Sequence, residues 1–211
     1  MITRARVVDW DFDGVLNRNL VNGEFLWKQS FDEDIGVPVA EFSAYVFRSC
    51  RFDPVLRGER DLKDLVAEWI DQSGCSKTED QILDYWFSKD ALPDAKTHAI
   101  FDRARASGFK NVIATNNEAR RAAYIQNNMG YGALTDHIFA AGPMKCMKPD
   151  ASFFEHIQEK LSAEPQDLFL IDDKVENVHA AQALGWHGFH FREGDYDGLE
   201  RALFGTPSSR V

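Results

Sequence analysis

The chain has 211 residues, of which 44% are hydrophobic and 27% charged, and its formal net charge is −10 at pH 7. This length allows one large domain or a core with a modest second domain, and the hydrophobic share suffices for a buried core. The acidic balance, with no basic cluster to offset it, argues against nucleic acid as a partner.

The sequence also argues against a membrane or secreted protein. Residues 1–6 lead directly into a strand-like run rather than into the apolar region of a signal peptide, and no stretch is long and apolar enough to span a bilayer. Cys50, Cys75 and Cys146 are odd in number and widely spaced, so we expect reduced thiols. These features predict no membrane partner and a cytoplasmic location.

The first strand-like run carries acids where a stable strand has no use for them. Residues 7 to 16 read Val-Val-Asp-Trp-Asp-Phe-Asp-Gly-Val-Leu, an apolar run that ends in Asp11 and Asp13 and breaks at Gly14. Burying unpaired charge is expensive, so a bound cation or a chemical role explains these acids better than stability does. The structural alternative is a turn at Asp13 and Gly14 with Asp11 at an edge. Asp9 lies inside the run, where we expect a strand edge or a hydrogen bond to a neighbouring loop.

Residues 17–92 differ in character from the rest, because they contain no run suited to a further core strand. Helix-length amphipathic stretches cover Phe25 to Ile35 and Leu62 to Ile70, with turn signals at Asp53-Pro54 and Ser73-Gly74. The simplest interpretation is a helical insertion after the first strand.

Strands and helices alternate along the remaining chain. Strand-like runs cover residues 111–115, 137–140, 168–173 and 187–191. Helices are expected from Pro93-Asp94 to Gly108, after Asp150, and from Val175 to Leu184. This alternation predicts an α/β fold with a doubly wound parallel sheet, whose ligands bind at the carboxyl ends of the strands.

Polar residues of suitable chemistry follow these runs. Thr115 and Asn116 end one strand just before a helix N-terminus, which favours a phosphate. Lys148 also precedes a helix, where its ammonium could act on a phosphoryl group as a point charge. Asp172 and Asp173 would repel each other unless a divalent cation lay between them and the first acids, and oxygen ligands suit magnesium.

Taken in order, these motifs resemble those of the haloacid dehalogenase-like (HAD) superfamily. The match covers about residues 6 to 191, and its intervals are similar to those of members with a helical C1 cap after the first motif. The resemblance implies a Rossmann-like core domain of residues 1–16 and 93–211 and an α-helical cap domain of residues 17–92. In that family the cap closes over the active site and selects the substrate.

The resemblance also implies an activity, that of a magnesium-dependent phosphatase that hydrolyses a small phosphomonoester through an aspartyl-phosphate intermediate. Weaker similarity to sugar-phosphate phosphatases and to the phosphatase domain of soluble epoxide hydrolases makes a sugar phosphate one candidate substrate. The implied roles are nucleophile for Asp11, general acid/base for Asp13, phosphate binding for Thr115, Asn116 and Lys148, and Mg²⁺ binding for Asp11, Asp13 through its carbonyl, Asp172 and Asp173.

Other functions of the same fold stay open. A phosphomutase would share every core residue. A dehalogenase would use Asp11 without magnesium and typically lacks the second acid, so Asp13 counts against it. A non-catalytic binding member would be expected to have lost a motif residue, and none is missing. The sequence does not indicate an oligomeric state.

Three residues of the insertion are candidates for substrate selection: Arg57, Arg60 and Trp86. The two arginines flank Gly58 in a basic stretch, although a solvated helix start explains them as well. Trp86 lies in an aromatic run, Tyr85-Trp86-Phe87, which packing inside the cap would also explain.

Overall fold

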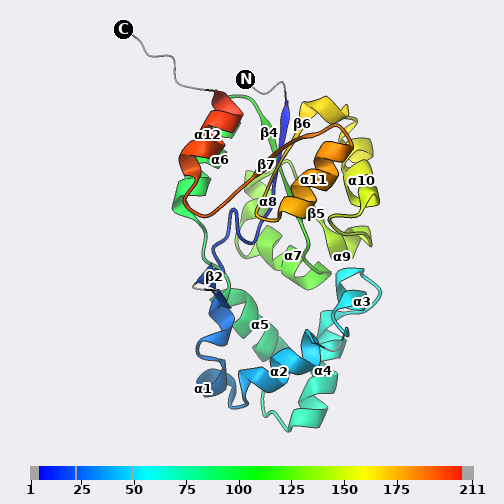
Figure 1. Ribbon diagram of the computed structural model, residues 1–211. Coiled ribbons are helices and arrows are strands. Elements are labelled where there is room, and N and C mark those ends of the chain that lie inside the picture. The colour runs from blue at the N-terminus through cyan, green and yellow to red at the C-terminus, as the bar shows by residue number, and fades with distance from the viewer. Residues whose placement is uncertain (1–4, 22, 49, 206–211) are drawn as a thin grey trace.

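The computed structural model describes residues 5–21, 23–48 and 50–205, and its upper part in Figure 1 is a five-stranded sheet. The strand order is β5-β4-β1-β6-β7, and every neighbouring pair is parallel. The predicted α/β fold is therefore confirmed. The strands are β1 (Val7–Trp10), β4 (Lys110–Thr115), β5 (His137–Ala140), β6 (Leu168–Asp172) and β7 (His187–His190).

The central strand β1 is buried on both faces, which explains its nearly continuous apolar sequence. Val8 and Trp10 pack into one hydrophobic cluster, whereas Val7 packs into another on the opposite face. Trp10 lies beside Ile113 of β4 and Ile171 of β6 in the parallel register. The side chains of three strands thus alternate between two cores.

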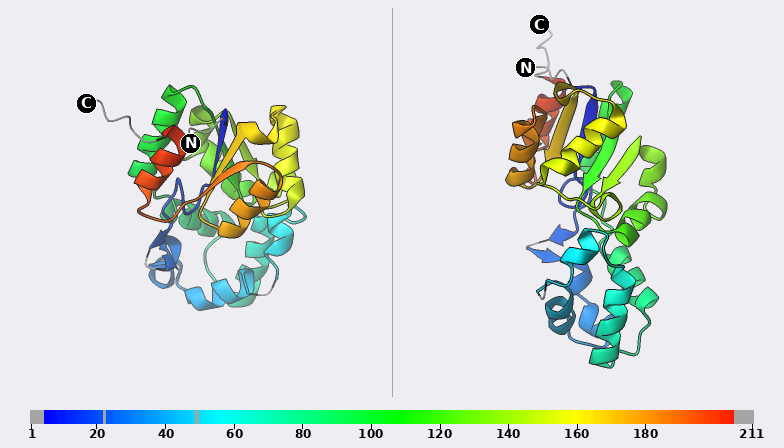
Figure 2. Two further views of the ribbon diagram at one scale, coloured as in Figure 1. Left: turned by 45° about the horizontal axis from the view of Figure 1, so that its top comes forward. Right: turned by 90° about the vertical axis from the view of Figure 1, so that its right-hand side faces the viewer.

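Helices cover both faces of this sheet (Figure 2). Residues of α6 and α12 belong to the cluster with Trp10, and residues of α10 and α11 belong to the cluster with Val7. Asp94 caps α6 with hydrogen bonds from the main-chain N–H groups of Lys96 and Thr97, as its position in the sequence suggests. The helices of this part are α6 (Ala95–Ala106), α7 (Ala119–Asn127), α8 (Tyr131–Leu134), α9 (Ala141–Met144), α10 (Ala151–Leu161), η2 (Pro165–Asp167), α11 (Val175–Ala183) and α12 (Tyr196–Phe204).

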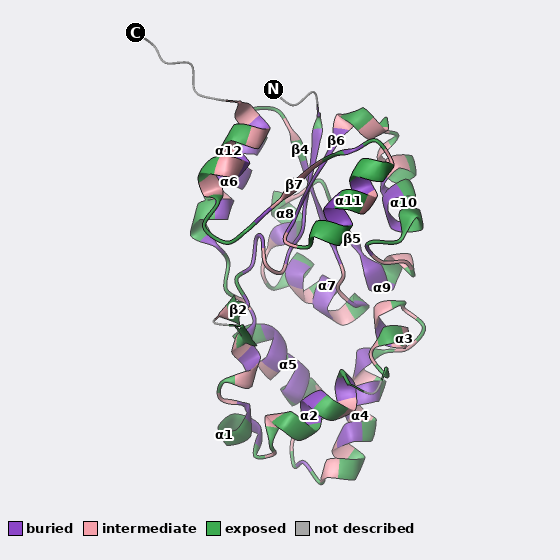
Figure 3. Ribbon diagram, viewed as in Figure 1, coloured by how far each residue is buried: buried purple, intermediate pink, exposed green. Residues whose placement is uncertain are grey.

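A second group of elements is inserted between β1 and α6, below the carboxyl ends of the strands in Figure 1. It has its own hydrophobic cluster, in which Trp27, Phe42 and Trp69 are almost completely buried. Figure 3 shows the buried residues of α4 and α5 that face this cluster. Its elements are β2 (Leu20–Val21), β3 (Glu24–Phe25), η1 (Leu26–Lys28), α1 (Phe31–Ile35), α2 (Val39–Val46), α3 (Asp53–Leu56), α4 (Leu62–Ser73) and α5 (Glu79–Lys89). The predicted limits of two separate domains, at residues 16 and 92, stay a prediction.

The insertion differs from the sequence expectation at its start. The stretch from Phe25 to Ile35 is not one helix, because β3 and the short η1 precede α1. Trp27, Phe31 and Ile35 are nevertheless all buried, as their helical spacing suggests. An Asp90 carboxylate oxygen accepts a hydrogen bond from Trp27 N at 3.1 Å, and this tertiary contact holds the η1 turn in place.

Asp9 contradicts both explanations drawn from the sequence. It lies in the central strand rather than at an edge, and it is completely buried. Neither of its carboxylate oxygens has a hydrogen-bond partner among the described residues. Burial raises the pKa of Asp9 well above its ordinary value, although the nearby charge of Lys148 opposes that rise.

Two smaller expectations concern the cysteines and the membrane. Cys50, Cys75 and Cys146 are all free thiols. No helix within the described parts of the chain combines the length and the apolar character that crossing a membrane requires.

The first prediction concerns the core of the insertion. Phe42→Ala should lower the free energy of unfolding by about 3–5 kcal/mol, because it removes a fully buried ring from a packed aromatic cluster. The free energy of unfolding is measured by urea unfolding, with tryptophan fluorescence as the signal. The control Leu134→Ala alters an exposed side chain of α8 and should cost less than about 1 kcal/mol. Equal costs for the two variants would contradict the assignment of Phe42 to a core.

Candidate active site

The candidate site lies at the carboxyl ends of three neighbouring strands. Asp11 directly follows β1, and its main-chain N–H donates to Ile171 O of β6, so the strand pairing continues to the acid itself. The main-chain N–H of Phe12 donates to Asp11 Oδ1 at 2.8 Å. Asp11 is only 7% exposed. The sheet therefore fixes this carboxylate in an almost completely buried position.

Lys148 is the centre of the site. Its Nζ lies 2.9 Å from Asp11 Oδ1 and 2.6 Å from Asp172 Oδ2, and it donates to Ala114 O at 2.6 Å. Burial alone would lower the pKa of this almost completely buried lysine, but the Asp11 and Asp172 carboxylates raise it above the ordinary value. Lys148 thus places an ammonium group between two acids, which favour its charged form.

The Asp172 side chain is held on every side by donors. Asn177 Nδ2 lies 3.0 Å from both of its oxygens, and the main-chain N–H of Lys174 donates to Oδ1 at 2.8 Å. Together with the contact to Lys148 Nζ, these bonds leave Asp172 as an anchor for the lysine.

A group of three acids could hold a divalent cation. Asp11, Asp172 and Asp173 each place one carboxylate oxygen within 4.8 Å of the others. Asp173 Oδ1 is buried and has no hydrogen-bond partner among the described residues, which is costly unless a cation binds it. Burial raises the pKa of Asp11 and of Asp173, and the neighbouring carboxylates add to both rises. The donor set therefore fits Mg²⁺, and the carboxylate of Asp13 is not part of it.

Gly14 allows the chain after β1 to lie close to Asp173, which directly follows β6. Its φ is +93°, and a Cβ added there would lie 2.6 Å from Asp173 Oδ2. Both the left-handed backbone and the close contact exclude a larger residue. The glycine that breaks the first run is thus required by the position of Asp173.

Asp13 lies beside the acidic group with its side chain held by two amides. Asn17 Nδ2 donates to Asp13 Oδ1 at 2.8 Å, and Asn117 Nδ2 donates to Oδ2 at 2.9 Å. The guanidinium of Arg121 lies 4.0 Å from Asp13 Oδ1. The Asp13 side chain is 28% exposed, and these contacts fix its carboxyl group beside the cavity described below.

Thr115 and Asn116 are close to these groups, but their side chains already have partners. Thr115 Oγ1 accepts a hydrogen bond from Asn117 at 2.8 Å. The Asn116 amide binds the main chain of Lys148 twice, since Nδ2 donates to its carbonyl and Oδ1 accepts from its N–H, both at 2.8 Å. The Asn116 side chain therefore positions Lys148.

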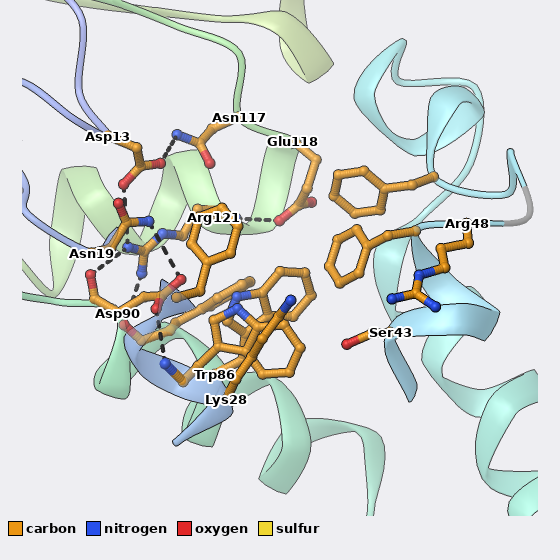
Figure 4. Close-up of a pocket in the computed structure, with 15 residues that line it drawn as sticks. Asp13, Asn19, Lys28, Ser43, Arg48, Trp86, Asp90, Asn117, Glu118 and Arg121 are labelled. Carbon is orange, nitrogen blue, oxygen red and sulfur yellow. Dashed lines mark hydrogen bonds and ion pairs between the residues drawn. The ribbon is translucent and has the colours of Figure 1, made fainter. Parts of the chain in front are cut away.

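A cavity of about 400 Å³ opens beside Asp13, between the sheet and the inserted helices. In Figure 4, Asp13 and Asn117 lie at one side, Ser43 and Arg48 at the opposite side, and Trp86 between them. The lining residues are Asp13, Asn19, Phe25, Trp27, Lys28, Ser43, Phe47, Arg48, Phe52, Trp86, Phe87, Asp90, Asn117, Glu118 and Arg121.

Only one of the three candidates for substrate selection lines this cavity. Trp86 does so, and it belongs to the aromatic cluster of the insertion as well. Arg57, in the insertion, instead pairs with Asp150 of the sheet-containing part, across the boundary (the seam) between these two parts. Arg60 pairs with Glu68 within the insertion. Neither arginine is therefore placed to contact a ligand in the cavity.

Sequence reasoning missed a buried polar group next to the cavity. Arg121 is 5% exposed and donates to the carbonyls of Phe87 and Asp90, at the point where the insertion rejoins the core. Asn17 bridges the same seam, with hydrogen bonds to Asp13 and to Asp90 O. No short motif marks these residues, since they meet only in the folded chain.

Comparison with known proteins identifies the family. The model for haloacid dehalogenase-like hydrolases matches residues 5–185, and the chain belongs to this family. The sesquiterpene phosphatase astK of Aspergillus oryzae is 24% identical over 193 residues, covering 92% of this chain and 93% of that protein. The drimenol cyclase drtB of Aspergillus calidoustus is 34% identical over 80 residues, which are 36% of this chain and 15% of that protein.

Solved structures with the same fold include a HAD family enzyme, bt-2542, of Bacteroides thetaiotaomicron. It superposes with a TM-score of 0.76 at 19% identity, covering 93% of this chain and 98% of that one. A complex of bt-2542 with magnesium and inorganic phosphate gives a TM-score of 0.73 at 18% identity, covering 90% of this chain and 96% of that chain.

The second prediction concerns Asp90, which is 3% exposed. Burial raises its pKa from 3.8 to about 6, against the opposing effects of the Trp27 N–H and of Arg121. A carboxyl group whose pKa rises on folding lowers stability progressively as the pH increases from 3.8 to about 6. Above about pH 6 the full cost of about 3 kcal/mol applies. Asp90→Asn should therefore exceed the wild type in unfolding free energy near pH 8, with a gap that shrinks toward about pH 4.

Urea unfolding of both proteins across this pH range measures the gap. The control Asp64→Asn changes an exposed acid of α4 and should leave the pH dependence as it is. A constant difference between Asp90→Asn and wild type at all pH values would contradict a buried, titrating Asp90.

Proposed function

We propose that the protein is a magnesium-dependent phosphatase that hydrolyses a phosphomonoester through an aspartyl-phosphate on Asp11. The observation that carries this proposal is the buried Lys148 between Asp11 and Asp172, next to an Asp173 oxygen that has no hydrogen-bond partner in the described parts of the chain. Support also comes from the name of the relative astK, a phosphatase, and from the bt-2542 complex with magnesium and phosphate.

The cation would be held by Asp11 and Asp173, and by Asp172 directly or through water. The family resemblance adds the main-chain carbonyl of Asp13. When bound, Mg²⁺ supplies positive charge that neutralises the phosphoryl oxygens beside the Asp11 carboxylate. Lys148 supplies a further positive charge, 2.9 Å from Asp11 Oδ1.

In the first step an Asp11 oxygen attacks phosphorus, and the bond from phosphorus to the alcohol oxygen breaks. Phe12 N–H and Lys148 both contact Oδ1, so attack is assigned to Oδ2. The departing oxygen keeps the bonding electron pair and takes a proton from Asp13, whose carboxyl group Asn17 and Asn117 orient.

In the second step water hydrolyses the aspartyl-phosphate. Asp13, now a carboxylate, takes a proton from the water as its oxygen attacks phosphorus, and the bond to Asp11 breaks. Inorganic phosphate leaves, and both acids return to their starting states. Phosphate monoester hydrolysis requires upwards of about 20 kcal/mol of catalysis, whereas one oriented donor supplies ~3 to 4 kcal/mol, so the complete set of groups must act together.

Two of the three alternatives lack a comparable observation. A dehalogenase does not need an oriented second acid, yet two asparagines hold Asp13 beside the cavity. A non-catalytic protein would gain nothing from a buried Asp173 oxygen that no described residue hydrogen-bonds. A phosphomutase would need the same groups, and only its products would differ.

The third prediction tests the nucleophile. Asp11→Asn should lower kcat for any phosphomonoester by at least about a thousandfold, because an amide of nearly the same shape neither attacks phosphorus nor carries negative charge. Released phosphate measures the rate, and circular dichroism checks the fold. Asp102→Asn, an exposed acid of α6, is the control and should retain full activity. Turnover of Asp11→Asn within a few-fold of wild type would rule out the covalent mechanism.

The fourth prediction concerns the metal. Treatment with a chelator should abolish phosphate release, and added Mg²⁺ should restore it, since the acidic group then regains its cation. The assay is run at constant ionic strength. The same concentration of chelator, already saturated with calcium, is the control for effects of the chelator itself. Full phosphate release in chelator would contradict the proposed magnesium dependence.

A further inference from the structure

We propose that the substrate is the phosphate monoester of a bulky apolar alcohol of the isoprenoid type, whose hydrocarbon part fills the cavity beside Asp13. This inference rests on the proposed phosphatase function and names its substrate class. It departs from the sugar phosphate that the sequence suggested.

The position of the cavity supports this assignment. Asp13 lies beside the acidic group and also lines the cavity, so the ester oxygen that it protonates lies at that side of the cavity. The alcohol part of the substrate must then extend into the cavity, away from Lys148 and Asp11. The chemical nature of the lining therefore decides which alcohol fits.

The walls of the cavity are largely aromatic, with six rings contributed by Phe25, Trp27, Phe47, Phe52, Trp86 and Phe87. Trp86 is the common neighbour, since its ring centroid lies 5.4 Å from those of Trp27 and Phe47. Phe25 and Phe47 are 39% and 36% exposed, although aromatic rings favour burial. A hydrocarbon chain in the cavity would cover these two rings and gain their burial.

Most polar side chains of the lining already have partners within the protein. Asp90 accepts from Trp27 N and Asn19, Glu118 caps α7, and Arg121 donates to two carbonyls. A sugar would bring several hydroxyl groups into contact with these paired groups and with aromatic rings. Hydroxyls buried without new hydrogen bonds cost free energy, so the lining disfavours a sugar.

Three further polar residues line the cavity: Lys28, Arg48 and Ser43. Lys28 Nζ lies 5.5 Å from the Trp27 ring centroid and 5.6 Å from that of Phe25, so its charge is directed at two rings. Arg48 is exposed at the far side. The buried Ser43 Oγ has no hydrogen-bond partner among the described residues, and it leaves room for one polar substituent at the far end of the hydrocarbon.

The size of the cavity agrees with this class of substrate. About 400 Å³ lies within the usual range of small-molecule sites, roughly 300–1,000 Å³. A short polar alcohol such as glycerol would leave most of the aromatic wall uncovered. A branched hydrocarbon of isoprenoid length would contact rings on several sides at once.

The test compares esters that share one reacting group. We measure kcat/KM for farnesyl monophosphate, glycerol phosphate and glucose phosphate, with p-nitrophenyl phosphate as the reporter of the chemistry. Farnesyl monophosphate should exceed the two polar esters by at least about a hundredfold, because its binding energy is available at the transition state. Suppose that p-nitrophenyl phosphate is hydrolysed, but kcat/KM for the polar esters equals or exceeds that for farnesyl monophosphate. This inference would then be overturned, while the proposed function stands.

A variant assigns the preference to the cavity wall. Phe47→Ala removes a partly exposed ring, so the protein should still fold, and the ratio of kcat/KM for farnesyl to p-nitrophenyl phosphate should fall about tenfold. Phe25→Ala is a second, independent variant with the same expectation. The control Leu134→Ala removes an exposed apolar side chain that does not line the cavity and should keep the ratio unchanged. An unchanged ratio in both phenylalanine variants would overturn the assignment.

Binding separates this inference from the proposed function. Calorimetric titration should show that a non-hydrolysable farnesyl phosphonate binds at least about a hundredfold more tightly than methyl phosphonate. If no ester is hydrolysed but this difference is found, the phosphatase proposal fails and the apolar cavity site stands. If the two phosphonates bind equally, the apolar site is overturned whatever the activity.

Discussion

The buried ammonium of Lys148 is the interaction on which the rest of the site depends. It joins Asp11 after β1, Asp172 at the end of β6 and Ala114 in β4, so one charge ties together three strands. Without it, two buried carboxylates would face each other, and loss of one partner of a buried ion pair costs about 3–5 kcal/mol. The same arrangement keeps Asp11 fixed and Asp173 available for a cation.

A second constraint lies at the seam between the sheet and the inserted helices. Asn17 and Arg121 both bind the carbonyl of Asp90, and both also lie near Asp13. The general acid/base proposed here is therefore oriented by the residues that join the two parts. The aromatic cavity opens at this seam, so the position of the inserted helices determines both its shape and its access to Asp13.

The sequence predicts the sheet and its acidic edge well, because a parallel strand buried on both faces must be apolar until it ends. Asp11, Asp172 and Asp173 stand out in the sequence for this reason, whereas Lys148 stands out because it precedes a helix. The cavity could not be predicted, since Trp27, Phe47 and Trp86 meet only after the insertion folds. The roles of Asn116 and Asp9 were also hidden, because a sequence does not show which hydrogen bonds a side chain has already made.

The central claim is that the Asp11 carboxylate attacks phosphorus and carries the phosphoryl group for part of each turnover. Trapping the intermediate tests it most directly: the protein is mixed with a phosphate-labelled ester and Mg²⁺, quenched in acid during steady turnover, and its peptides are mapped. The account predicts an acid-stable, base-labile label on the peptide that contains Asp11. Full turnover with no label on the protein, or with the label on another residue, would contradict it.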